Sequence, residues 1–201
     1  MKKPADTTLP LMNEIKNRWS PRAFDTHPVE PEKLERIFEA ARWSASCFNE
    51  QPWRFIVGLK EQDDAWDKIY HCLTETNKIW CKSVPVLILL VAKNSFSHND
   101  RLNKWAVYDL GQSAAYICMQ ATAEGLYVHQ MAGFDAEEAR SAFSVPDNFE
   151  IKTAMAVGYF GDPENLPDKL KKSELSKRSR KEIPEIVYSG AWGSPVKFIK
   201  S

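Results

Sequence analysis

Two short clusters of arginine and serine are the residues of this chain best suited to bind an anion. Residues 18–22 and residues 178–180 each hold two arginines with a serine between them. Guanidinium groups bond phosphate oxygens in pairs and keep their charge at neutral pH. The whole chain has 27 basic and 27 acidic residues, so an anion site has to come from local clusters rather than from an overall positive field. The alternative for both clusters is a set of solvated surface charges, and the second lies within a lysine-rich run, residues 169–181.

A small polar loop, residues 44–52, separates two strongly patterned segments. The apolar residues of 34–41 recur at the spacing of one helix face, and residues 53–58 have the bulky, β-branched composition of a buried strand. The loop is therefore a helix-to-strand connection, whose backbone amides and short side chains can meet a ligand. Pro52 favours an extended conformation at Gln51, which would end any helix there.

The hydrophobic pattern elsewhere predicts further helices and strands within one domain, residues 1–201. It predicts helices at 9–17, 66–80, 104–124 and 135–143, and strands at 84–92, 126–131 and 149–160. The helix at 104–124 carries small residues that allow another helix to approach closely, including the same helix of a second subunit.

The end of the chain, residues 164–201, is predicted to form a C-terminal arm and tail. Residues 164–182 are rich in lysine, serine and proline and predict a mobile or extended arm. The following tail carries Val187, Tyr188 and Trp192. Because the arm has no apolar face of its own, these three side chains need another surface to cover them.

Two motifs resemble the signatures of one family. Residues 46–53 resemble the Ser-x-x-Asn-x-Gln-Pro-Trp signature of the nitroreductase superfamily of FMN-dependent oxidoreductases, and residues 18–24 resemble its upstream Arg-x-Ser-x-Arg-x-Phe signature. The resemblance extends from about residue 13 to about residue 193. It implies an α+β nitroreductase-like fold: a central mixed or antiparallel β-sheet flanked by helices, with a C-terminal extension exchanged in a dimer.

The same resemblance implies a flavin site shared between two subunits. Arg18, Trp19 (through its backbone) and Ser20 would meet the phosphate and ribityl chain, and Arg22 the pyrimidine edge of the flavin. The backbone amides of Ala132 and Gly133 would face flavin N5, and no side chain is assigned as an obligatory acid or base. The full set of expected cofactor-binding residues is Arg18, Trp19, Ser20, Arg22, Ala45, Ser46, Cys47, Asn49, Gln51, Asn77, Gln130, Met131, Ala132, Gly133, Arg178 and Arg180.

The activity implied by the resemblance is hydride transfer from NAD(P)H through flavin N5 to nitroaromatic, quinone or related electrophilic acceptors, in a ping-pong sequence. Two positions depart from some members of the family, which carry lysine where this chain has Trp80 and glutamate where it has Ala132. Without that lysine, Arg22 would provide more of the electrostatic support for the reduced flavin. The alternatives are a specialised enzyme of the same fold, such as a reductive dehalogenase or a flavin-destroying synthase, and a flavin-binding sensor without turnover.

Several other classes of site are not indicated by the sequence. The glycine-rich phosphate loops of Rossmann and P-loop proteins are absent. The four cysteines lack the spacing of a zinc site, so we expect no metal and a cytoplasmic protein with reduced thiols. The four histidines are scattered and suggest no catalyst. The longest apolar run, residues 84–92, is far shorter than a membrane helix, and the balanced charge predicts no nucleic-acid partner.

Overall fold

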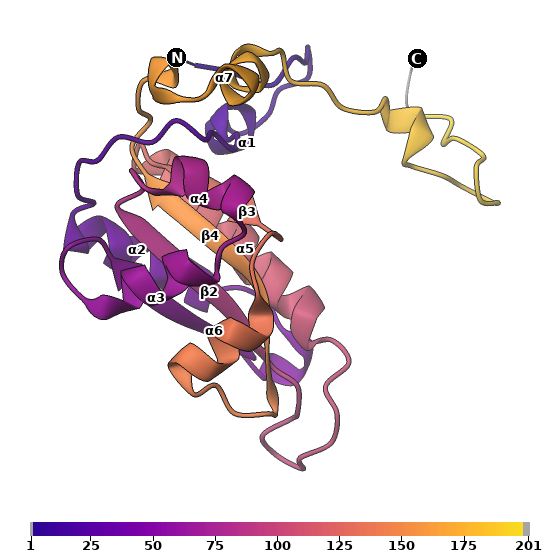
Figure 1. Cartoon of the computed structure of the whole chain (residues 1–201). Helices are drawn as coiled ribbons and strands as arrows, with labels where there is room; N and C mark the ends of the chain where they lie inside the picture. The colour runs from indigo at the N-terminus through magenta and orange to yellow at the C-terminus, as the bar shows by residue number, and fades with distance from the viewer. Residues whose placement is uncertain (1, 199–201) are drawn as a thin grey trace.

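A four-stranded antiparallel sheet lies between two layers of helices in the computed structural model, which describes residues 2–198 (Figure 1). The strands are β1 (Trp53–Leu59), β2 (Val86–Lys93), β3 (Tyr127–Met131) and β4 (Phe149–Gly158), in the order β1-β2-β4-β3. The predicted α+β fold with a central antiparallel sheet is therefore confirmed. Within residues 2–198, no helix combines the length and the apolar character needed to cross a membrane.

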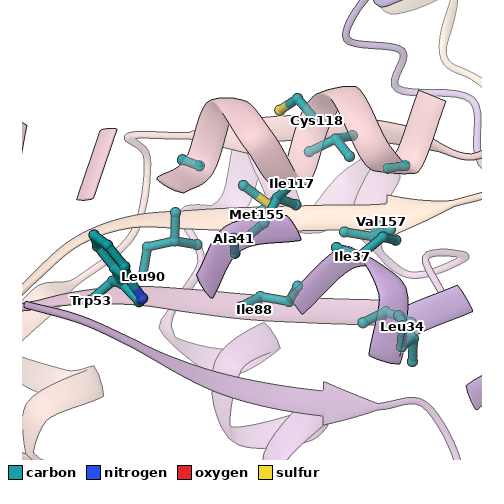
Figure 2. Close-up of a cluster of buried hydrophobic side chains, with 14 of the residues drawn as sticks. Leu34, Ile37, Ala41, Trp53, Ile88, Leu90, Ile117, Cys118, Met155 and Val157 are labelled. Atoms are coloured by element: carbon teal, nitrogen blue, oxygen red, sulfur yellow. The ribbon is translucent and has the colours of Figure 1, made fainter. Parts of the chain in front are cut away.

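One face of the sheet is covered by α2 (Pro31–Arg42) and α5 (Ala106–Ala123). Ile88 and Leu90 of β2 point to this side because alternate residues of a strand face opposite ways. Figure 2 shows Ile37 from α2 and Ile117 from α5 within this cluster. The helical spacing at 34–41 and the long helix predicted at 104–124 are both confirmed.

The other face is covered by α3 (Asp64–Cys72), α4 (Glu75–Cys81) and α6 (Ala136–Phe143). Leu87 and Leu89 of β2 belong to this second cluster, so β2 is buried on both sides, as its almost continuous apolar run predicts. The single helix predicted at 66–80 is wrong, since the chain breaks between α3 and α4. At this break the extended residue Leu73 forms an isolated bridge with Phe134.

The N-terminal helix is shorter than the sequence pattern predicts. Only α1 (Asn13–Asn17) is helical, and the predicted start at residue 9 is wrong. Leu11, Met12 and Ile15 are exposed, so no apolar face is buried that would support a longer helix. A short helix without such packing is marginal in water.

The C-terminal arm is partly helical, which corrects the prediction of an extended arm. It contains a 3-10 turn, η2 (Pro163–Asn165), and then α7 (Asp168–Leu175). Beyond α7 the chain leaves the body and runs outward, with one further turn, η3 (Ile183–Glu185) (Figure 1). In the tail, Trp192 is 93% exposed and its ring contacts Tyr188 at 5.2 Å between centroids. Val187 and Tyr188 are half-buried, so within residues 2–198 only Trp192 of these three is left without a covering surface.

Candidate functional site

The two arginine clusters, although about 160 residues apart in sequence, lie together in the structure. Arg18 ends α1, and its Nη1 donates to Ser20 Oγ at 3.2 Å. Arg178 follows α7, and its Nη1 donates to the Lys3 carbonyl oxygen at 2.6 Å. Burial, together with the nearby charges of Arg18 and Arg180, lowers the pKa of Arg178. Mutually repelling guanidinium groups of this kind are stabilised when an anion binds between them.

A buried carboxylate holds the backbone of the first cluster. Glu174 is 2% exposed, and its Oε1 accepts hydrogen bonds from the backbone N–H of Arg22 at 2.8 Å and of Ala23 at 3.1 Å. On the other side of this segment, the Gly161 N–H donates to the Ala23 carbonyl oxygen at 2.9 Å. The segment is therefore fixed from both sides. Glu174 is not predicted as a site residue from the sequence.

His129 connects β3 to the same arginine cluster. Its Nδ1 lies 2.7 Å from the Pro21 carbonyl oxygen; because a carbonyl can only accept, Nδ1 carries the proton. The imidazole also packs against Trp80, with 4.7 Å between ring centroids. Burial, and to a smaller extent the charge of Arg22, lowers the pKa of His129 from 6.5 to about 4. His129 is therefore a neutral hydrogen-bond donor at physiological pH.

This neutral histidine predicts that the protein loses stability as the pH falls below 6.5. The folded state binds the His129 proton only near pH 4, whereas the unfolded chain binds it near pH 6.5. The contribution of His129 to the free energy of unfolding is therefore fully present above pH 6.5 and is lost as the pH falls toward 4. The free energy of unfolding should fall by about 2 kcal/mol between pH 7 and pH 5 from this residue alone.

Urea unfolding at both pH values tests the prediction on wild type and on His129→Gln, which keeps a neutral donor. The variant should lose most of this pH dependence. His71→Gln is the matched control, because His71 is exposed on α3, and it should behave like wild type. Equal pH slopes in wild type and His129→Gln would contradict the assignment.

Asn77 and Gly133 form a close-packed corner between α4 and the end of β3. Asn77 Nδ2 donates to the Gly133 carbonyl oxygen at 2.9 Å, and Trp80 Nε1 donates to Asn77 Oδ1 at 3.3 Å. A Cβ atom on Gly133 would lie 2.8 Å from both Asn77 Nδ2 and Thr74 Oγ1. Only glycine fits here without displacing a neighbour. Trp80 itself is 2% exposed, so it occupies the core rather than the surface of the site.

The other predicted site residues at the end of β3 differ in which of their groups are exposed to a ligand. Gln130 is exposed, and its Nε2 donates to Cys118 Sγ at 3.6 Å. Met131 is 3% exposed, and its sulfur accepts from Cys81 Sγ at 3.5 Å. Its side chain thus belongs to the core, and only its backbone is open to a role in a site. Ala132 is exposed.

The helix-to-strand loop is anchored on the first turn of α5. The Cys47 N–H donates to Asp109 Oδ2 at 3.0 Å, and Asp109 is 2% exposed. Within the loop, the Gln51 N–H donates to Ser46 Oγ at 3.0 Å. Ala45 is exposed. Asp109 thus gives the loop a fixed position, a role that the sequence pattern does not predict.

The loop backbone is also unusual, and it corrects one prediction. Phe48, Asn49 and Gln51 have φ values of 54°, 55° and 52°, in the left-handed region. The extended conformation predicted for Gln51 from the following Pro52 is therefore wrong. Each non-glycine residue in this region costs on the order of 1 kcal/mol or more, and such strain concentrates at functional loops.

The two motifs lie at opposite ends of the sheet within one chain. Phe24 pairs with Phe160, just beyond the end of β4, whereas Trp53, which follows the loop, lies in register with the start of β4. A strand of ten residues spans roughly 30 Å. Within residues 2–198, no hydrogen bond or salt bridge joins residues 18–24 to residues 44–52. Within one chain the two motifs are therefore separate.

The thiol groups are poor candidates for nucleophiles. Burial raises the pKa of Cys72 to about 11 and also raises the pKa values of Cys81 and Cys118. These three are therefore protonated thiols at neutral pH. Cys47 is half-buried in the loop, where its backbone N–H is already bonded to Asp109.

Comparisons with known proteins relate the chain to one family. The model of the nitroreductase family matches residues 15–80 and 62–159. A 15.4 kDa protein of Mycolicibacterium smegmatis is 29% identical over 149 residues, which cover 71% of this chain and 99% of that protein. The major NAD(P)H-flavin oxidoreductase of Aliivibrio fischeri is 32% identical over 97 residues, 46% of this chain and 44% of that protein. A crystal structure described as an oxidoreductase containing FMN is 30% identical, with a TM-score of 0.87 and coverage of 94% of this chain and 96% of that one.

Proposed function

Since the chain belongs to the nitroreductase family, we propose that it is an FMN-dependent oxidoreductase that uses NAD(P)H to reduce small electrophilic acceptors. When bound, FMN would supply the redox chemistry, namely hydride acceptance from NAD(P)H and reduction of a nitroaromatic, quinone or related acceptor in a ping-pong sequence. The observation that carries the proposal is the convergence of Arg18 with Arg178 and Arg180 beside β3, where Pro21 bonds to His129. The protein residues bind and orient the cofactor and are assigned no acid–base step.

The chemistry of these residues fits FMN. Its phosphate carries nearly two negative charges at neutral pH, which suits Arg18, Arg178 and the Ser20 hydroxyl. Arg22 would meet the pyrimidine edge and stabilise the negative charge of the reduced flavin. The backbone amides of Ala132 and Gly133 would face flavin N5, while the Cβ position of Gly133 is already filled by Asn77 and Thr74. The phosphate and the ring are thus each matched by groups of suitable charge.

We propose further that the functional unit is a homodimer with two shared flavin sites. In one chain the loop at 44–52 lies at the far end of the sheet from residues 18–24, a separation that a single FMN does not bridge. The loop of one subunit would complete the site built by the arginines of the other. Two-fold symmetry then gives two equal sites per dimer.

The surface of the chain supports such an assembly. Along α5, Tyr108 and Tyr116 are exposed, and the face between them carries the small residues Gly111 and Ala115. Small residues on a helix face allow a second helix to approach closely. The outward-running tail adds Trp192, which is 93% exposed and would be covered by the partner.

The proposed function predicts that the protein purifies yellow, with non-covalent FMN. Heat-released cofactor should have the chromatographic retention of FMN, and one FMN should be recovered per chain. Addition of NADH or NADPH without oxygen should bleach the bound flavin within seconds. Release of FAD, or an apoprotein that ignores added FMN, would refute the proposal. Bound FMN that neither nucleotide bleaches would instead indicate a sensor without turnover.

A further inference from the structure

The carboxylate of Glu174 occupies an unusual position for a charged group. It lies on α7, where it is the buried residue of an otherwise largely exposed helix. Its Oε1 accepts from two backbone N–H groups, those of Arg22 and Ala23, at 2.8 and 3.1 Å. Burying a carboxylate is costly unless it is well hydrogen-bonded. An apolar side chain would hold α7 against the body without this cost, so the carboxylate needs another explanation.

The residues that Glu174 binds belong to the proposed flavin site. Arg22 is the arginine assigned to the flavin ring, and its backbone conformation decides where its guanidinium group can reach. Hydrogen bonds to a charged acceptor are roughly twice as strong as those between neutral groups. Glu174 therefore fixes the backbone from which Arg22 extends, while the Arg22 side chain is left half-buried and available to a ligand.

A second set of contacts connects Glu174 to the arginine of the arm. Lys3 Nζ donates to the Glu174 carbonyl oxygen at 2.7 Å and lies 4.6 Å from the centre of the Trp19 ring. The Lys3 carbonyl oxygen in turn accepts from Arg178 Nη1 at 2.6 Å. These contacts run from Arg178 through Lys3 and Glu174 to Arg22 and thus connect both arginine clusters. Figure 1 shows α7 near α1, from which the first cluster follows.

We infer that Glu174 is a positioning residue for the cofactor site: its carboxylate holds the backbone of Arg22 and Ala23 and couples the placement of α7 to FMN binding. This inference rests on the proposed function. Because such coupling is reciprocal, bound FMN should in turn hold α7 on the body. The lysine-rich segment at 169–181 should then be cut more slowly by trypsin when FMN is present.

The test measures the Kd of FMN for refolded apoprotein, by quenching of flavin fluorescence, in wild type and two variants. Glu174→Ala removes the acceptor and should weaken FMN binding by roughly tenfold or more, the effect typical of losing a partner that orients a binding group. Glu174→Gln keeps an oxygen acceptor without the charge and should lie between wild type and Glu174→Ala. Trypsin protection by FMN at 169–181 should decrease in the same order.

Asp63→Ala is the matched control. Asp63 also accepts from two backbone N–H groups, those of Ala65 and Trp66, at the start of α3. Its loss should lower the melting temperature and leave the Kd unchanged, which separates positioning from general stability.

Failure of the inference and failure of the proposed function give different results. If wild type does not bind FMN, the proposed function is refuted. If wild type binds FMN and the folded Glu174→Ala variant binds it equally well, only the positioning role is refuted. Should Glu174→Ala not fold, a wild-type Kd in Glu174→Gln refutes the role, and a Kd at least threefold higher supports it.

Discussion

A mixed dimer with one chain altered at Arg18 and Arg22 and the other at Ser46 and Asn49 should regain about half of the wild-type activity. Each altered chain should be inactive as its own homodimer. If the two motifs meet across the interface, the mixed dimer contains one site with both motifs altered and one intact site. The activity is measured on heterodimers purified with two different affinity tags, as NADH oxidation with a quinone acceptor.

The reciprocal mixed dimer is the control. It places the alanine substitutions of Arg18, Arg22, Ser46 and Asn49 together in one chain and pairs that chain with wild type. For a shared site, each of its two sites then lacks one motif, so activity should be close to zero. If both motifs served the flavin of their own chain, the results of the two experiments would be exchanged. The opposite pattern would thus refute the shared site even if the protein is dimeric.

Removing both arginines proposed to bind the phosphate should almost abolish FMN binding. In Arg18→Ala with Arg178→Ala, two charge-assisted contacts are lost. At about 1.5–3 kcal/mol each, together they should raise the Kd of FMN by roughly 10²- to 10⁴-fold. Burial and the neighbouring arginines already lower the pKa of Arg178, so this side chain should gain most from a bound anion. Fluorescence titration of the apoprotein provides the Kd.

A double variant at Arg36 and Arg42 controls for the change of charge. These arginines pair with Glu124 and Glu39 on the surface and are 50% and 58% exposed. Their replacement by alanine removes the same two charges and should leave the Kd within about twofold, because surface pairs contribute little. A similar loss of affinity in both double variants would show that net charge, rather than a specific site, attracts the cofactor.

The parts of the fold that the sequence predicts are those in which local pattern and burial agree. β2 is apolar on both faces because helices cover both sides of it, and the spacing in α2 follows its contact with α5. The break between α3 and α4 is different. Leu73 continues the helical spacing in sequence, yet it is extended and bridges to Phe134, a tertiary contact that no local pattern reveals.

The residues of the candidate site also fall into two groups, those that the sequence predicts and those that it does not. The arginine clusters and the loop are found from residue type and spacing, whereas the partners that hold them depend on contacts between distant segments. Glu174 lies 152 positions from Arg22. One signal was available, since Leu170 and Glu174 stand four residues apart, the spacing of one helix face, within the predicted arm. Nothing in sequence indicates that His129 bonds to Pro21.

The crowded corner at Gly133 constrains how homologous sequences can diverge. Asn77 Nδ2 and Thr74 Oγ1 both lie where a Cβ atom would stand, at 2.8 Å, and both belong to side chains that can be replaced by smaller ones. A change at residue 133 is therefore tolerated only after residues 74 and 77 have both become smaller or have moved aside. Across an alignment of relatives, these three positions should covary, with a side chain at 133 accompanied by substitutions at both 74 and 77.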